Sequence, residues 1–223
     1  LMPPEASELS LESAGDGAFR PPAAAKAPLH NLPASPTNFV GRVESLAAVT
    51  GLLRQPEVRL VSLTGPGGTG KTRLSLETGR EMLEAFPHGV YFIDLAKVSD
   101  PGLVAATAAH TLGIREGGSQ PPMEILKETL ASKEMLLILD NFEQVTAAAA
   151  DLSDLLAATP GVKALVTSRI PLKLRWEHEY PVSPLDMPAA VPTAGRQPLE
   201  DLLEIESVAL FRQQARAVQP NFE

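Results

Sequence analysis

Apolar positions follow two alternating patterns along most of the chain. Runs rich in β-branched residues and leucine predict strands at 58–64, 89–95 and 162–167, with a weaker strand at 179–182. The run 135–139 is almost continuously apolar, as expected for a strand that is covered on both faces of a parallel sheet. Apolar residues at helical spacing predict helices at 43–53, 71–86, 102–112, 123–131, 145–158 and 207–218. Strands that alternate with helices are typical of an α/β fold with a doubly wound, mainly parallel sheet, which binds ligands beyond the carboxyl ends of its strands.

The same pattern suggests how the chain is divided. Residues 1–36 are rich in proline, alanine and serine and have no sustained apolar period, which predicts a linker from an upstream domain. Residues 37–200 carry the alternating pattern and are expected to form one domain, whose end, 183–198, is a proline-rich loop. Residues 201–223 are expected to begin a helical domain, in which Ser207 caps the last helix. The chain starts at Leu1 without a leader pattern, so we expect an internal piece of a longer protein.

Composition narrows the possible functions. The chain has no cysteine, which excludes disulfides, thiolate metal sites and a cysteine nucleophile. No apolar run approaches the roughly 18 residues of a membrane span, so we expect a cytoplasmic protein without a membrane partner. The net charge of −8 argues against broad contact with a nucleic-acid backbone, so DNA would be reached only through a domain outside this sequence. The four histidines are scattered, and none are at metal-ligand spacing.

A glycine-rich loop carries the clearest chemistry. It matches the phosphate-loop pattern GxxxxGK[ST] between a predicted strand and a predicted helix, and consists of Gly65, Pro66, Gly67, Gly68, Thr69, Gly70, Lys71 and Thr72. Backbone N–H groups of such a loop bind phosphates, and the lysine reaches the β- and γ-phosphates. We therefore predict a site for a purine nucleoside triphosphate with Mg²⁺, with Thr72 as a metal ligand and Arg73 as a neighbouring contact.

A carboxylate is expected to complete the metal site. Asp140 directly follows the apolar run 135–139, at the carboxyl end of a buried strand, where an unpaired carboxylate would be costly. The alternative is that Asp140 caps a helix. Hydrolysis also needs a group that orients or deprotonates water, yet the next residue is Asn141. Glu143 is the nearest candidate, although it could equally be a solvated residue at a helix start, so turnover is expected to be slow.

An arginine follows the fourth predicted strand. Residues 167–169 are expected at the same sheet edge as Asp140 and the phosphate loop, so Arg169 can reach the γ-phosphate and distinguish triphosphate from diphosphate. A surface salt bridge is the alternative role for this side chain.

Taken together, these motifs resemble the bacterial branch of the STAND ATPases, relatives of the NB-ARC domains. The resemblance covers residues 31 to about 222 and rests on NLPASPTNFVGR (31–42), LTGPGGTGKTRL (63–74), LLILDNFEQV (136–145), ALVTSRIPL (164–172) and SVALFRQQARA (207–217). It implies an ASCE-type P-loop NTPase fold, a three-layer αβα sandwich with a five-stranded, mainly parallel sheet. It also implies that Val40, Gly41 and Arg42 contact the adenine side of ATP or ADP.

The resemblance further implies a regulatory switch and weak ATPase activity. In such proteins ADP holds a closed form, ATP opens it, and the open form can self-associate or release an effector domain of the same polypeptide, such as a helix-turn-helix DNA-binding domain. The GLPL-type motif that normally closes over the nucleotide does not occur before the sequence ends at Glu223. Two other functions remain open: a nucleotide-dependent scaffold with little turnover, and a small-molecule phosphotransferase, for which the proline-rich loop holds only Arg196 as a lid arginine.

Overall fold

The structure, a computed structural model, describes residues 29–35, 37–115, 120–188, 199–219 and 221–222. Its centre is one five-stranded sheet in the order β2-β3-β4-β1-β5, in which every pairing is parallel. The strands are β1 (Leu60–Thr64), β2 (Val90–Asp94), β3 (Met135–Asp140), β4 (Val162–Ser168) and β5 (Glu177–Pro181). Because β4 lies between β1 and β3, the sheet has the ASCE-type order, and the predicted fold class is confirmed.

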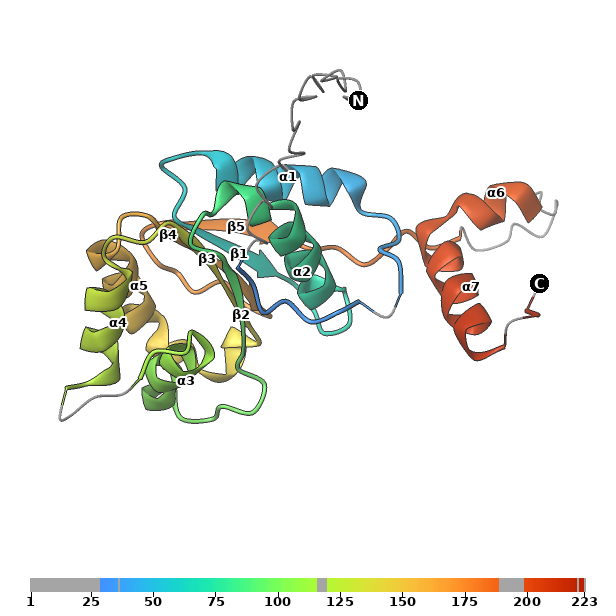
Figure 1. Cartoon of the computed structure of the whole chain (residues 1–223). Coiled ribbons are helices and arrows are strands. Elements are labelled where there is room, and N and C mark those ends of the chain that lie inside the picture. The colour runs from blue at the N-terminus through green and yellow to red at the C-terminus, as the bar shows by residue number, and fades with distance from the viewer. Residues whose placement is uncertain (1–28, 36, 116–119, 189–198, 220, 223) are drawn as a thin grey trace, which may run out of the picture.

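Helices cover both faces of the sheet, as Figure 1 shows. One face carries α1 (Val43–Arg54) and α2 (Lys71–Glu81), and the other carries α3 (Val104–Thr111), α4 (Pro122–Leu130) and α5 (Ala149–Ala158). Alternate residues of β3 enter the two cores, with Leu136 and Ile138 on the α1–α2 side and Leu137 and Leu139 on the other. This double burial explains why β3 is a continuous apolar run up to Asp140.

Several helix boundaries differ from the prediction. The second helix ends at Glu81 and continues as a 3₁₀ turn at Leu83–Ala85. The helix predicted from 145 begins only at Ala149, because two 3₁₀ turns, Phe142–Gln144 and Thr146–Ala148, precede it. These short turns keep the apolar spacing of a helix without forming one, so periodicity alone cannot separate them from α5.

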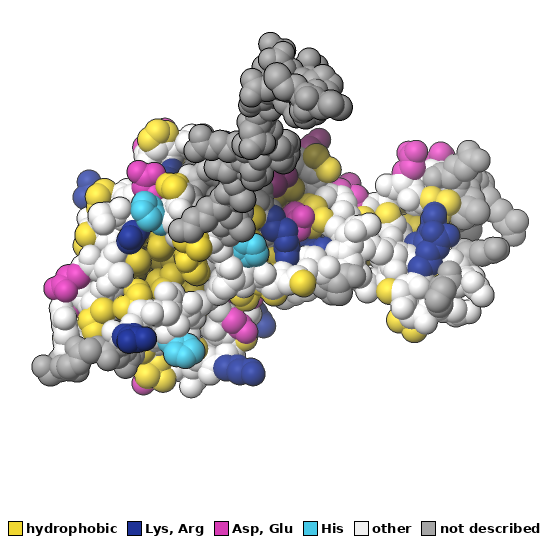
Figure 2. Space-filling view, in the orientation of Figure 1, with side chains coloured by type: hydrophobic (Ala, Val, Ile, Leu, Met, Phe, Trp, Pro, Cys, Tyr) yellow, Lys and Arg dark blue, Asp and Glu magenta, His cyan; other side chains and the backbone are white. Residues whose placement is uncertain are grey.

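The C-terminal helices correct two further expectations. A short helix, α6 (Leu199–Glu204), was not predicted, and the last helix, α7 (Glu206–Val218), has Ile205 rather than Ser207 at its N-cap. The prediction that Ser207 caps this helix is wrong, because Ser207 lies within the first turn and no side chain caps the helix. The α6–α7 segment stands beside the body of the molecule, and the surface narrows between them (Figures 1 and 2).

The described end of the predicted 1–36 linker lies along the sheet edge. His30 forms a parallel bridge with Val90, and the Asn31 side chain exchanges hydrogen bonds with the backbone of Phe92 at 2.8 and 2.6 Å. Leu32 is buried in the α1–α2 core. Residues 29–35 therefore belong to the packed structure, whereas 1–28 and 36 lie outside the described residues. Across the described part of the chain, no helix combines the length and apolar character needed to cross a membrane.

Candidate functional site

The glycine-rich loop turns the chain from β1 into α2. Gly65, Gly68 and Gly70 have φ values of 140°, 81° and 85°, which side-chain-bearing residues rarely adopt, so the loop can turn back on itself. Gly70 is the N-cap of α2, and no side chain caps this helix. Its first N–H groups are therefore available to an anion, and the positive end of the helix dipole favours one.

Lys71 is folded over this loop. Its Nζ donates to the carbonyl oxygens of Gly65 and Pro66, each at 2.8 Å, and the side chain is 8% exposed. An ammonium group held by neutral carbonyls lies where an anion entering the loop could replace them as its partner. The loop thus presents a cation and free helix N–H groups to the same space.

Asp140 lies across the sheet edge from the loop, at the end of β3. The Thr72 hydroxyl donates to this carboxylate, at 2.8 Å from Oδ1 and 3.0 Å from Oδ2, and the side chain is 4% exposed. Burial raises the pKa of the Asp140 carboxyl, and hydrogen bonds from Thr167 and Thr72 partly offset this effect. These hydroxyl partners, rather than a helix N-terminus, explain the position of Asp140, so the geometry does not favour a capping role.

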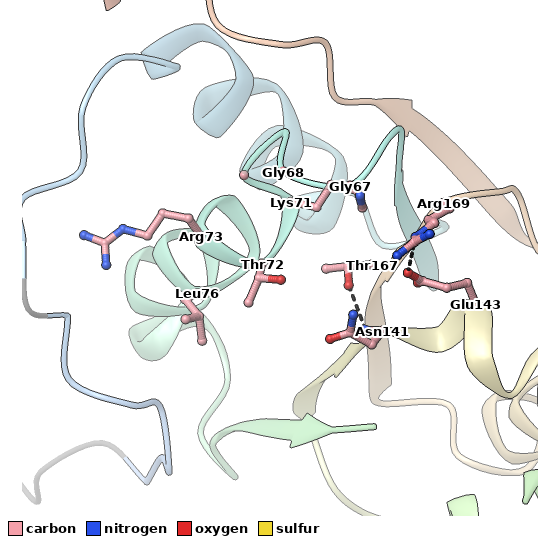
Figure 3. A pocket seen from close by; sticks show the side chains of 11 residues that line it. Gly67, Gly68, Lys71, Thr72, Arg73, Leu76, Asn141, Glu143, Thr167 and Arg169 are labelled. Carbon is pink, nitrogen blue, oxygen red and sulfur yellow. Dashed lines mark hydrogen bonds and ion pairs between the residues drawn. The ribbon is translucent and has the colours of Figure 1, made fainter. Parts of the chain in front are cut away.

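Thr167 was not among the predicted site residues. It lies on β4, between β1 and β3, is 2% exposed, and donates from Oγ1 to Asp140 Oδ1 at 2.5 Å. The same Oγ1 accepts from the Asn141 backbone N–H at 3.0 Å, the contact drawn in Figure 3. The sequence predicted Thr167 at the same sheet edge as Asp140, but the hydrogen bond between them becomes apparent only once β4 is known to be next to β3.

Glu143 and Arg169 form an ion pair at the rim of the site (Figure 3). Arg169 Nε lies 3.1 Å from Glu143 Oε1, and the side chains are 67% and 15% exposed, respectively. The second carboxylate oxygen, Oε2, is buried and has no hydrogen-bond partner among the described residues. A Cβ atom at Gly67 would lie 4.0 Å from Arg169 Nη2, so the guanidinium is close to the phosphate loop. The structure therefore brings together both candidate residues whose roles the sequence left open.

A pocket of about 510 Å³, which Figure 3 shows from close by, is lined by most of these groups, whereas Asp140 is bonded to the lining residues Thr72 and Thr167 but does not line the pocket itself. The predicted residues that line it are Gly67, Gly68, Gly70, Lys71, Thr72, Arg73, Glu143 and Arg169. In Figure 3 the Arg73 side chain extends away from Thr72, and its Nη2 donates to the Thr37 carbonyl. Arg73 therefore also faces a second pocket on the other side of the loop.

The second pocket, of about 450 Å³, adjoins the first along Gly67, Gly68 and Gly70. Of the three predicted adenine-side residues, Val40 and Arg42 line it. Residues from two further segments, not predicted as site residues, also contribute, namely Pro184, Leu185, Met187, Ser207, Leu210 and Gln214. Its lining is more apolar than that of the phosphate side, as a base-sized group requires.

Arg42 and Gly41 join this second pocket to its surroundings. Arg42 Nη2 donates to the carbonyls of Thr69 and Ser183, at 2.7 and 2.6 Å. The Arg42 backbone N–H donates to Glu206 Oε1 at 2.7 Å, and Gly41, with φ of 67°, lies directly against the Glu206 side chain. The α7 helix is thus attached to the loop that bounds the pocket.

The donor set at Asp140 suits a hard cation. Thr72 and Asp140 offer oxygen atoms, the ligand type that Mg²⁺ prefers. Among the described residues, no group of three or more histidine, cysteine, aspartate or glutamate side chains could hold a metal by itself. A cation here would therefore share its coordination with oxygen atoms of a ligand, as Mg²⁺ does when it is bound through a carboxylate and phosphates.

Comparisons with known proteins connect the chain to bacterial regulators. It is 34% identical over 165 residues to a Mycobacterium tuberculosis protein described as "Putative HTH-type transcriptional regulator", covering 74% of this chain and 17% of that protein. It is also 31% identical over 150 residues to the regulatory protein AfsR of Streptomyces griseus, covering 62% of this chain and 15% of AfsR. The chain therefore spans less than a fifth of the length of these two relatives. No family model matches it.

A solved structure of the Drosophila origin recognition complex bound to DNA has a similar fold. The TM-score is 0.50 at 15% identity, and the match covers 62% of this chain and 42% of that chain. At this identity the likeness concerns the fold alone. The fold is that of a P-loop NTPase, and the two sequence relatives described above carry the names of regulators.

Proposed function

We propose that residues 37–200 form the nucleotide-binding core of a STAND-type regulatory switch that binds ATP or ADP with Mg²⁺. The observation that carries the proposal is the Thr72–Asp140 hydrogen bond, which joins the last residue of the phosphate loop to the carboxylate at the end of β3. The motif order described above supports the STAND assignment. A phosphate loop, a lysine within it and an adjacent buried carboxylate together fit a magnesium nucleotide.

In this proposal each part of the site has one task. The loop N–H groups and Lys71 bind the β- and γ-phosphates, and the lysine exchanges its two carbonyl partners for phosphate oxygens. Thr72 and Asp140 hold Mg²⁺, which would supply positive charge against the phosphates. Val40 and Arg42 bound the adenine side, next to the phosphate loop.

Hydrolysis is proposed to be slow. Glu143 is the available group to orient or deprotonate water, and it is paired with Arg169 at 3.1 Å. Because Oε1 is paired with Arg169 and Oε2 is buried, Glu143 must leave Arg169 before Oε1 can accept a hydrogen bond from water. This pair also favours the second candidate function, a nucleotide-dependent scaffold with little or no turnover.

The regulatory context is proposed from the relatives. Because two long relatives are described as transcriptional or regulatory proteins, we propose that nucleotide state controls other domains of the same longer polypeptide. Contact with DNA would occur through such a domain, in the cytoplasm, since the net charge of this segment is −8. Residues 201–223 would begin the following helical domain, and self-association would depend on the bound nucleotide.

The proposal is tested by calorimetric titration of the chain with ADP and with a non-hydrolysable ATP analogue, each with Mg²⁺. The wild type and a Lys127→Ala control, altered on α4 in the opposite layer, are expected to bind both nucleotides. Lys71→Ala is expected to lose at least about tenfold in affinity, since a charge-assisted contact to phosphate is worth roughly 1.5–3 kcal/mol. Equal affinities for Lys71→Ala and Lys127→Ala would show that the nucleotide does not bind at this loop.

A further inference from the structure

One hydroxyl contacts both the Asp140 carboxylate and the backbone of the turn that carries Glu143. Thr167 Oγ1 has a single proton, which it donates to Asp140 Oδ1 at 2.5 Å. A lone pair of Thr167 Oγ1 accepts a hydrogen bond from the backbone N–H of Asn141 at 3.0 Å. The hydroxyl is therefore used as both donor and acceptor, and the residue that carries it is only 2% exposed.

The first of these bonds orients the carboxylate of Asp140. Oδ1 receives hydrogen bonds from Thr167 at 2.5 Å and from Thr72 at 2.8 Å, whereas Oδ2 has Thr72, at 3.0 Å, as its donor among the described residues. Oδ1 therefore accepts the shorter hydrogen bonds, from two hydroxyl groups, whereas Oδ2 accepts only the longer one from Thr72 among the described residues. A group that fixes one oxygen of a ligating carboxylate in this way orients the other.

The second bond holds the turn that carries Glu143. Asn141 has φ of 66°, a left-handed conformation that is uncommon for residues other than glycine. It begins the 3₁₀ turn Phe142–Gln144, which places Glu143 opposite Arg169. The acceptor for the Asn141 N–H at this turn is Thr167. The same hydroxyl that orients Asp140 therefore also fixes the start of the Glu143 turn.

A buried hydroxyl can have a purely structural reason, and the chain offers a comparison. Thr159 is also fully buried, and its Oγ1 donates to the Leu155 carbonyl, four residues earlier, at 2.7 Å. That bond lies within one helix end and joins no functional group. The Thr167 bonds join separate strands and loops, and Thr167 lines the same pocket as Thr72 and Glu143.

From this geometry we propose that Thr167 is a positioning residue that sets the Asp140 carboxylate for the metal and, through Asn141, holds the turn of Glu143. The inference rests on the proposed magnesium nucleotide function. Thr167 acts through Asp140 and Asn141 and is not itself a ligand. The proposal requires the hydroxyl and not the shape of the side chain, which makes valine and serine the informative replacements.

The test measures metal and nucleotide binding separately in the whole chain. Mn²⁺ binding to the ADP-loaded protein is followed by electron paramagnetic resonance, and ADP binding in EDTA is followed by calorimetry. Thr167→Val is expected to weaken Mn²⁺ binding by about 10- to 100-fold, as loss of a partner behind a metal ligand does, while ADP affinity in EDTA changes less than about twofold. Thr167→Ser is expected to restore Mn²⁺ affinity to within about threefold of wild type, since the hydroxyl returns.

Two controls separate this role from general damage. Thr159→Val, another buried threonine without its hydroxyl, is expected to leave both affinities unchanged, and thermal unfolding reports whether each variant is folded. If Thr167→Val does not fold, Thr167→Ala replaces it in the same comparison. Unchanged Mn²⁺ affinity in a folded variant, or a parallel loss of Mn²⁺ and ADP binding that serine does not repair, would overturn the proposal. Failure of the wild type itself to bind ADP would instead overturn the nucleotide function, and the role of Thr167 with it.

Discussion

Replacing Arg169 with alanine should change nucleotide preference much more than stability. The Arg169–Glu143 pair joins atoms 3.1 Å apart, but the arginine side chain is 67% exposed, so solvent screens the attraction. Exposed ion pairs of this kind contribute about 0–1 kcal/mol. The expected loss in free energy of unfolding for Arg169→Ala is therefore below about 1 kcal/mol.

The Arg169 guanidinium is expected to gain more binding free energy from a hydrogen bond to a γ-phosphate than it loses when its ion pair with Glu143 opens. A charge-assisted hydrogen bond to phosphate is worth about 1.5–3 kcal/mol, so exchanging Glu143 for the phosphate yields a net gain of about 1–2 kcal/mol. ADP lacks the γ-phosphate and cannot provide this gain. Arg169→Ala should thus reduce the preference for an ATP analogue over ADP by about 5- to 30-fold, mostly through weaker binding of the triphosphate.

Calorimetry with both nucleotides, on wild type, Arg169→Ala and the exposed neighbour Arg175→Ala, checks this expectation. Arg175→Ala removes an equal charge from the loop before β5, away from the pocket lining, and should leave the preference unchanged. Urea unfolding of the same proteins measures the stability difference. An unchanged preference in Arg169→Ala, or a stability loss above about 2 kcal/mol, would refute the reasoning, since the arginine would then be a structural residue.

Two further predictions concern the fold around the site. Arg59→Ala should lower the free energy of unfolding, measured by urea titration, by about 2–4 kcal/mol. The guanidinium of Arg59 donates to the carbonyls of Leu156, Thr159 and Val162 at 2.6–3.0 Å, around the end of α5. A loss below about 0.5 kcal/mol would contradict this role. Gly41→Ala should free α7, because a Cβ atom at this φ of 67° would lie 2.4 Å from Glu206 Cδ. Faster amide exchange in 206–218 is the expected result, with Gly51→Ala, which meets no atom within 4 Å, as the control; equal exchange in both variants would show that Glu206 does not hold the helix.

Much of the fold could be predicted because its strands are buried on both faces. The runs that became β1, β3 and β4 are rich in leucine and β-branched residues and are buried along almost their whole length, and the phosphate loop indicated the order of strand, turn and helix. The errors occurred where local spacing is ambiguous. Two 3₁₀ turns before Ala149 share the apolar spacing of a helix, and Ser207 resembles a cap although Ile205 holds that position.

The site was predictable where a residue belongs to a contiguous motif or stands at the end of a predicted strand. Lys71 and Thr72 belong to a contiguous motif, and Asp140 could be placed because it ends an apolar run. Thr167 depends on the order of strands, which sets β4 next to β3, and this order is not encoded in local periodicity. The contribution of Leu210 and its neighbours to the second pocket depends on how α7 returns to the 37–42 loop, which no pattern in the sequence specifies.

The central claim is that the loop at 65–72 holds the phosphates of an adenine nucleotide. The most direct measurement is an experimental structure of the chain prepared with ADP and Mg²⁺. We expect phosphate oxygens at the first N–H groups of α2, with Lys71 Nζ moved from the carbonyls of Gly65 and Pro66 to the β-phosphate. The cation is expected beside Thr72 and Asp140. A nucleotide bound elsewhere, with Lys71 still hydrogen-bonded to its two carbonyls, would show that the loop at 65–72 is not the nucleotide site.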